Sequence, residues 1–228
     1  MTNASLSLFH LTHEPRERTD KKPPLLVLLH GYGSNEQDLI QLAPELDPRF
    51  FIVSPRAPMT IGPEMHAWFH IEFIPTGITV DLQQAAAARQ MLIGFIDELI
   101  TAYPVDPAQV FLMGFSQGAV MTYTMVFSQP EKFAGAVVMS GQMPPQSFLE
   151  RVPVEKLRDF PIFVAHGVFD EVLPVKLGRE GKKYLESLPV KFVYHEYPMG
   201  HQVSLESMAD ISAWLTNRLN ANQGDTAC

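Results

Sequence analysis

Residues 110–118 read Val-Phe-Leu-Met-Gly-Phe-Ser-Gln-Gly, and the expected architecture follows from this stretch. Its first four residues are a continuous apolar run, typical of a buried strand in a parallel sheet. Its last five form the pattern Gly-x-Ser-x-Gly, and residues 119–127 continue with helical spacing. This order, with a serine on a sharp turn between a strand and a helix, is typical of a nucleophilic serine. We therefore predict that Ser116 is exposed at the carboxyl edge of a sheet. Gly114 and Gly118 lack side chains, which lets neighbouring segments come close to this turn.

A second glycine-rich turn lies earlier in the chain. Residues 25–29 are a continuous apolar run, and His-Gly-Tyr-Gly-Ser follows at residues 30–34. Hydrolysis by a serine needs two backbone N–H groups that bind the oxyanion, one directly after the nucleophile and one in the loop after an earlier strand. We therefore expect the N–H groups of Gln117 and Tyr32 to form the oxyanion hole. The alternative for residues 30–34 is an ordinary turn between a strand and a helix.

Short apolar segments alternate with longer segments of helical period, which predicts an α/β fold with a mostly parallel central sheet and helices on both faces. Strands are expected at residues 25–29, 50–53, 110–114, 134–139, 161–165 and 190–197, and helices at 35–46, 80–103, 117–128, 175–188 and 203–220. Residues 190–197 alternate with period two, which favours a place near the edge of the sheet. Because the chain shows no repeat or linker, we expect one domain over residues 1–228, with a flexible tail from about 221 to 228.

The partners of the serine should lie in later loops. A serine hydroxyl is a weak nucleophile until a base takes its proton, and the base needs an acid that fixes its tautomer. After a serine at a strand-to-helix turn, the acid and then the histidine follow along the chain. Asp170 comes after the expected strand 161–165 and His201 after 190–197, so they are the predicted acid and base. Glu171 remains an alternative acid, and His166 is expected to be a hydrogen-bonding scaffold residue.

Residues 59–79 fit neither the helical nor the strand period. They hold large apolar side chains among proline, glycine and histidine, and an apolar loop of this length usually covers something. The segment can be a flap on the core, a wall of the substrate pocket or a dimer contact. The residues expected to line an apolar pocket, here and beside the catalytic residues, are Met65, Trp68, Phe69, Phe73, Leu173 and Met199.

Composition limits the classes of partner and compartment. Apolar residues make up 46% of the 228 residues, and 17 basic against 25 acidic residues give a net charge of −8. This composition excludes intrinsic disorder, and an acidic chain without a basic stripe is a poor ligand for nucleic acid. Residues 1–22 lack the apolar run of a signal peptide, and no later run approaches 18 apolar residues. We therefore expect a cytoplasmic protein without membrane insertion.

Neither a cofactor nor a metal is expected. The single cysteine, Cys228, excludes an intramolecular disulfide and a Cys-rich zinc site. The eight histidines show no His-Glu-x-x-His spacing, which argues against a metal site of that kind. The expected partner is a small-molecule ester substrate, and the expected state is a monomer or a homodimer.

Five segments resemble the phospholipase/carboxylesterase family of α/β-hydrolases, which includes acyl-protein thioesterases and small bacterial carboxylesterases. They are Leu-His-Gly-Tyr-Gly at 29–33, Ala-Trp-Phe at 67–69, Gly-Phe-Ser-Gln-Gly at 114–118, His-Gly-Val-Phe-Asp-Glu-Val-Leu-Pro at 166–174 and Gly-His at 200–201. The resemblance implies an α/β-hydrolase fold, with the roles of nucleophile, acid, base and oxyanion donors at Ser116, Asp170, His201, Tyr32 and Gln117. Trp68 matches a tryptophan that lies near the acyl pocket in relatives.

Three positions depart from the family's pattern. Tyr32 stands where eukaryotic thioesterases usually carry leucine, His70 replaces a frequent aspartate, and Ala119 replaces a frequent third glycine. These changes leave the triad intact and make the bacterial esterases the closer likeness. We expect a serine carboxylesterase for short- to medium-chain acyl or aryl esters. A lysophospholipase or acyl-thioesterase on the same triad is the alternative, and a non-catalytic ligand-binding scaffold is a remote one.

Overall fold

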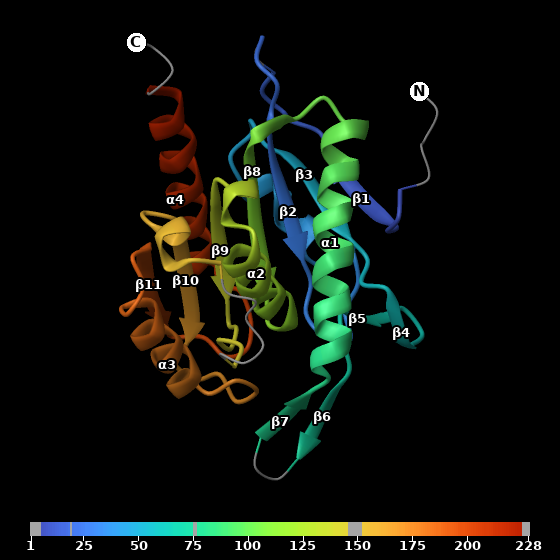
Figure 1. Ribbon diagram of the computed structural model, residues 1–228, viewed down its shortest axis with the longest axis vertical. Helices are drawn as coiled ribbons and strands as arrows, with labels where there is room; N and C mark the ends of the chain where they lie inside the picture. The colour runs from blue at the N-terminus through green and yellow to red at the C-terminus, as the bar shows by residue number, and fades with distance from the viewer. Residues whose placement is uncertain (1–5, 19, 75–76, 146–151, 225–228) are drawn as a thin grey trace.

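The computed structural model describes residues 6–18, 20–74, 77–145 and 152–224. Within this part, seven strands form the central sheet in the order β1-β3-β2-β8-β9-β10-β11 (Figure 1). Their bounds are β1 His10–His13, β3 Phe51–Pro55, β2 Pro24–Leu29, β8 Asp106–Phe115, β9 Gly135–Met139, β10 Pro161–Gly167 and β11 Lys191–Tyr197. Neighbouring strands are parallel except for β1 and β3. The parallel strands therefore end at one edge of the sheet, the lower edge in Figure 1.

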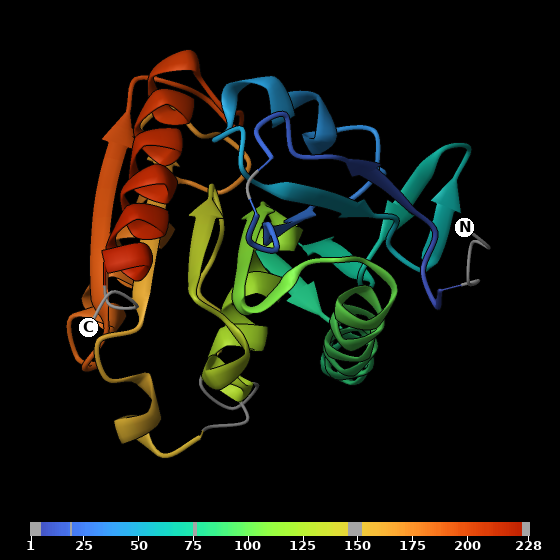
Figure 2. The same ribbon diagram turned by 90° about the horizontal axis from the view of Figure 1, so that it is seen from above.

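Helices cover both faces of the sheet, as the alternation of segments predicted. The helices α1 (Leu82–Ala102), α2 (Gln117–Ser128) and α3 (Val175–Leu185) pack on one face, in an apolar cluster that includes Val27 of β2. The 3-10 helix η1 (Leu39–Glu45) and α4 (Leu205–Gly224) pack on the other face, which receives the next side chain of β2, Leu28. Figure 2 shows α1 and α4 on opposite sides of the sheet. The mostly parallel sheet between two helical layers is confirmed.

Local sequence explains where the main elements begin and end. The Asp81 side chain accepts hydrogen bonds from the N–H groups of Gln83 and Gln84, both at 3.0 Å, and so caps α1. α1 ends at Ala102, with Tyr103 and Pro104 next in the chain. The helix does not continue because proline disfavours helical backbone in the residue before it. The apolar run 110–113 forms the buried centre of β8, and β11 is the edge strand that its period-two pattern predicted.

Several segments differ from the sequence prediction. The helix expected over residues 35–46 is the shorter η1, since the Asn35 side chain accepts from the Gln37 N–H in a turn and Pro44 offers no N–H. Residues 59–79, expected as a loop, contain the hairpins β4 (Met59–Gly62) with β5 (Met65–Ala67) and β6 (Ile71–Ile74) with β7 (Gly77–Val80). The edge strand β1 was not predicted. Short 3-10 helices also occur at η2 (Pro130–Lys132) and η3 (Val154–Leu157).

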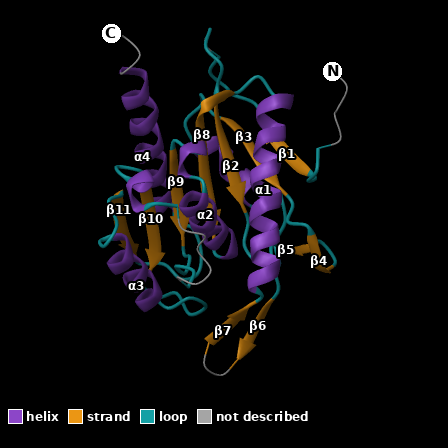
Figure 3. Cartoon of the chain, viewed as in Figure 1, coloured by secondary structure: helices purple, strands orange, loops and turns teal. Residues whose placement is uncertain are grey.

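Two further segments complete the described structure, the β6–β7 hairpin and the end of α4. Figure 3 shows the β6–β7 hairpin extending past the lower edge of the sheet, next to the start of α1. At the other end of the chain, α4 continues to Gly224, so part of the expected tail is helical, while residues 225–228 lie outside the described residues. No helix in the described ranges is long and apolar enough to cross a membrane.

Candidate active site

Ser116 lies on a strained turn between β8 and α2. Its backbone has φ 54° and ψ −115°, a region that costs a residue with a Cβ about 1–3 kcal/mol. The turn is held because the Ser116 N–H donates to the carbonyl of Met139 at 2.9 Å. A Cβ on Gly118 would overlap the carbonyl oxygen of Leu29, and a Cβ on Gly114 would overlap that of Gly118. Glycine is therefore required on both sides of the serine, as the motif predicted.

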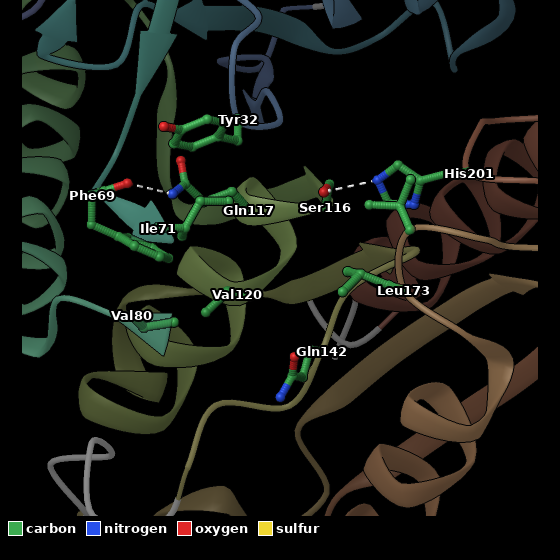
Figure 4. Close-up of a pocket in the computed structure, with 11 residues that line it drawn as sticks. Tyr32, Phe69, Ile71, Val80, Ser116, Gln117, Val120, Gln142, Leu173 and His201 are labelled. Atoms are coloured by element: carbon green, nitrogen blue, oxygen red, sulfur yellow. Dashed lines mark hydrogen bonds between the residues drawn. The ribbon is translucent and has the colours of Figure 1, made fainter. Parts of the chain in front are cut away.

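A chain of hydrogen bonds joins Ser116, His201 and Asp170. The Oγ of Ser116 lies 2.9 Å from Nε2 of His201, and Nδ1 of His201 lies 2.7 Å from Oδ2 of Asp170. Figure 4 shows the imidazole pointing at the serine hydroxyl. A carboxylate can only accept a hydrogen bond, so Nδ1 carries the ring proton and Nε2 is free to accept the serine proton. This is the tautomer that a general base needs.

The Asp170 carboxylate is buried and has two backbone donors. Its Oδ1 accepts from the N–H groups of Val172 at 3.0 Å and Leu173 at 2.7 Å. The Asp170 side chain has no exposed surface, whereas the alternative acid Glu171 is exposed. The geometry therefore brings Asp170, and not Glu171, to His201.

The two expected oxyanion donors lie beside the serine. Gln117 begins α2, so its N–H has no carbonyl of its own helix to bind. The loop that carries Tyr32 lies close against the serine. A Cβ added to Gly31 would be only 3.3 Å from the Cβ of Ser116. β5 holds this loop, with the Gly33 N–H donating to the His66 carbonyl at 2.9 Å. Tyr32 and Gln117 both line the cavity next to Ser116 (Figure 4).

An apolar cavity of about 180 Å³ opens beside Ser116. Of the six residues expected in the pocket, Phe69 and Leu173 line it. The other lining residues are Tyr32, Ile71, Val80, Ser116, Gln117, Val120, Gln142, Val172 and His201. Ile71 and Val80 come from the ends of the β6–β7 hairpin, so the segment 59–79 does supply part of the wall.

Three of the expected pocket residues lie elsewhere. Trp68 is buried outside the cavity lining, and its Nε1–H donates to the carbonyl of His30 at 2.9 Å. Met199 is buried in the apolar cluster on the α4 face of the sheet. Met65 is 43% exposed on the β4–β5 hairpin. None of these three residues lines the cavity, and the side chain of Phe73 is outside the part that the structure describes.

The Gln117 side chain has a structural role that the sequence analysis missed. Its Oε1 accepts from the N–H of Trp68 at 2.9 Å, and its Nε2 donates to the carbonyl of Phe69 at 2.7 Å. All of these groups are buried, so the amide satisfies two backbone groups that water cannot reach. The residue after Ser116 thus fixes the segment that carries Phe69 into the cavity wall. Its position in the motif was visible in the sequence, but the partners of its side chain were not.

His30 supports the oxyanion loop in its neutral form. Its Nε2 accepts from the N–H of Ala57 at 3.1 Å, and its Nδ1 lies 2.8 Å from the carbonyl of Gly31. An N–H can only donate and a carbonyl can only accept, which places the proton on Nδ1. Burial lowers the pKa of His30 below its ordinary value of 6.5, which keeps the ring neutral.

The described residues contain no group of three or more His, Cys, Asp or Glu side chains that could hold a metal ion. The groups present at the cavity are the Ser116 hydroxyl, the His201 imidazole, the Asp170 carboxylate and the backbone N–H groups around them. Such an arrangement can transfer an acyl group to the serine and then to water.

The chain matches one protein family over most of its length. Residues 14–219 match the family model described as Phospholipase/Carboxylesterase. A probable carboxylesterase of Oryza sativa subsp. japonica is 31% identical over 179 residues, which cover 76% of this chain and 66% of that protein. Acyl-protein thioesterase 1 of Kluyveromyces lactis is 30% identical over 213 residues, which cover 86% of this chain and 92% of that protein.

A solved structure shows the same architecture. The crystal structure of the Bacillus cereus carboxylesterase superposes with a TM-score of 0.80 at 25% identity, covering 95% of this chain and 96% of that one. The family match spans both turns and all three hydrogen-bonded residues at the cavity. The resemblance seen in the sequence motifs is thus confirmed, and the chain belongs to the phospholipase/carboxylesterase family, with the α/β-hydrolase fold.

Proposed function

We propose that this protein is a serine carboxylesterase that hydrolyses short- to medium-chain acyl or aryl esters through an acyl-enzyme. One observation carries the proposal: Ser116, His201 and Asp170 form a continuous chain of hydrogen bonds at an apolar cavity. The parallel strands that lead to these residues belong to one sheet, which supports a single domain over residues 1–228.

The first half-reaction forms an ester on Ser116. Nε2 of His201 takes the hydroxyl proton as Oγ attacks the acyl carbon, and the Asp170 carboxylate stabilises the imidazolium that results. The N–H groups of Tyr32 and Gln117 donate to the oxyanion, and one such donor contributes about 10²–10³ in rate. When the C–O bond to the alcohol breaks, His201 returns the proton to the leaving oxygen, and the alcohol departs.

The second half-reaction releases the acid. A water molecule takes the place of the alcohol, and Nε2 of His201 accepts its proton as the water oxygen attacks the acyl-enzyme. The bond between Ser116 Oγ and the acyl carbon then breaks, and His201 returns a proton to Oγ. The products are one carboxylic acid and one alcohol, and Ser116 is restored without a cofactor.

The cavity supports the short- to medium-chain preference. Its wall beyond Ser116 is formed by Phe69, Ile71, Val80 and Val120, which offer apolar contacts to an acyl group. A volume of about 180 Å³ suits a short chain better than a palmitoyl chain. A second candidate, acyl-thioesterase activity, is favoured by the 30% identity to acyl-protein thioesterase 1 of Kluyveromyces lactis, which extends over 86% of this chain.

Hydrolysis of p-nitrophenyl esters from acetate to palmitate, beside a Ser116→Ala control, tests the proposal. We expect turnover that is highest for short or medium chains and that is lost in the control. Turnover of long chains alone would favour a lysophospholipase or thioesterase instead. No Ser116-dependent turnover at any length would favour a non-catalytic scaffold. A cytoplasmic location and a monomeric or homodimeric state remain predictions.

A further inference from the structure

A fully buried histidine, His166, lies next to Asp170 of the proposed triad. His166 is the next-to-last residue of β10, and its side chain has no exposed surface. The ring packs against Gly178 of α3, where an added Cβ would come within 2.7 Å of Nδ1. The strand on one side and the helix on the other leave the imidazole little room to move.

One hydrogen bond joins His166 to the loop that carries Asp170. Nε2 of His166 lies 2.7 Å from the carbonyl oxygen of Leu173. Because a carbonyl oxygen can only accept, Nε2 carries the ring proton and donates it. The N–H of Leu173 in turn donates to Oδ1 of Asp170 at 2.7 Å. The backbone of Leu173 therefore links the buried imidazole to the carboxylate.

The orientation of the Asp170 carboxylate depends on this loop. Oδ1 accepts from the N–H groups of Val172 and Leu173, while Oδ2 faces Nδ1 of His201 at 2.7 Å and Nε2 of His166 at 3.7 Å. The carboxylate has no exposed surface, so water cannot replace a lost partner. A shift of the Leu173 backbone would therefore turn the carboxylate relative to His201.

We propose that His166 is a positioning residue for the esterase reaction: by holding the carbonyl of Leu173, it fixes the Asp170 carboxylate in the orientation that His201 needs. This inference rests on the proposed function of Ser116, His201 and Asp170. The same hydrogen bond holds Leu173 in the wall of the cavity, so His166 connects the acid to the pocket without touching the substrate.

Two amide variants separate this role from simple packing. In His166→Gln the amide nitrogen reaches about as far as Nε2 and can still donate to Leu173. In His166→Asn the shorter amide ends near the position of Nδ1, toward Gly178, and the hydrogen bond to the Leu173 carbonyl is lost. We expect His166→Asn to lower kcat by about 10–100-fold with KM nearly unchanged, and His166→Gln to stay within about threefold of the unaltered protein. Each kcat is calculated per active site, with the concentration of active sites measured by fluorophosphonate titration. Unfolded chains therefore do not lower the measured kcat.

A spectroscopic readout reports on the acid directly. The proton between His201 Nδ1 and Asp170 Oδ2 should give a far-downfield proton NMR signal, which we expect to weaken in His166→Asn and to remain in His166→Gln. A purely structural role of His166 would change the thermal midpoint and leave this signal in place. His195→Asn is the matched control, because His195 lies on the neighbouring strand β11 and contacts Phe163 and Tyr197 instead.

The outcomes are distinguishable. The proposal is overturned if both His166 variants keep the native kcat and the His201 signal, or if His166→Gln loses as much kcat as His166→Asn. If His166→Asn does not fold, His166→Gln decides: a retained signal and kcat support the proposal, and a loss beyond about tenfold overturns it. Failure of the proposed function itself would appear as a lack of Ser116-dependent turnover in the unaltered protein.

Discussion

Nδ1 of His201 lies 2.7 Å from Oδ2 of Asp170, and the carboxylate that accepts this hydrogen bond is completely buried. The acid therefore fixes the ring proton on Nδ1 and turns Nε2 toward the hydroxyl of Ser116, 2.9 Å away. The two residues come from different loops, yet both loops follow parallel strands of one sheet. The proposed reaction depends on this one contact for the tautomer of its base.

Asp170→Asn tests the contact. The amide can donate to His201 and so favours the wrong tautomer, and we expect kcat for p-nitrophenyl butyrate to fall by about 10³–10⁴-fold. The matched control is Glu171→Gln, because Glu171 is the neighbouring carboxylate and is exposed. A large loss of kcat in Glu171→Gln, with a nearly native kcat in Asp170→Asn, would show that Glu171 and not Asp170 is the acid.

The pH profile of kcat/KM tests the role of His201. A protonated imidazole cannot accept the Ser116 proton, so we expect the rate to fall steadily on the acid side of neutrality. The measurement is kcat/KM for one short-chain ester across the acid range, with the fold checked by circular dichroism at each pH. A rate that stays flat down to about pH 4 would contradict a histidine base.

Gln117→Met tests the buried amide between the serine turn and the cavity wall. Methionine has a similar length but leaves the N–H of Trp68 and the carbonyl of Phe69 without partners. Each of the two buried unpaired groups costs about 1–3 kcal/mol, so we expect the free energy of unfolding to fall by about 2–6 kcal/mol. The control is Gln142→Met, which changes the same cavity but neither hydrogen bond. Equal denaturation midpoints for the two variants would show that the amide does not stabilise the wall.

The lowered pKa of His30 predicts acid sensitivity of the fold. Burial lowers the pKa of His30 in the folded protein below 6.5, so the unfolded chain binds the proton more readily. The stabilisation from neutral His30 is therefore complete above pH 6.5 and is lost as pH falls from 6.5 toward the folded-state value. We expect His30→Gln, whose oxygen can still accept from Ala57, to show a flatter dependence of Tm on pH. His70→Gln is the exposed control, and a curve for His30→Gln with the same slope as native would exclude this contribution.

The sequence predicted every strand of the central sheet except β1, and the residues of the proposed triad, because both follow from simple rules. Residues 110–118 combine a buried strand, a glycine on each side of Ser116 and a helix, and each of these features restricts the backbone near it. Chain order then pointed to Asp170 and His201, since parallel strands bring their carboxyl ends to one edge. The hydrogen-bonded residues at the cavity are the same three.

The cavity wall could not be predicted in the same way. Ile71 and Val80 face the cavity because β6 and β7 pair as a hairpin, and this pairing leaves no periodic signal in so short a segment. Trp68 was expected near the pocket because it matches a tryptophan near the acyl pocket of relatives, but its indole N–H needs a buried acceptor and donates to the His30 carbonyl, and the residue does not line the cavity. Side-chain partners far apart in sequence, such as Gln117 with Phe69, become visible only in the structure.

Covalent labelling of Ser116 tests the central claim most directly. The protein is incubated with a fluorophosphonate, its intact mass is measured, and the adduct is located by peptide mapping while residual esterase activity is followed in parallel. The proposed mechanism predicts one adduct per chain, on Ser116, formed in step with the loss of activity and greatly slowed in Asp170→Asn. An adduct on another residue, or full inactivation with Ser116 unmodified, would contradict it.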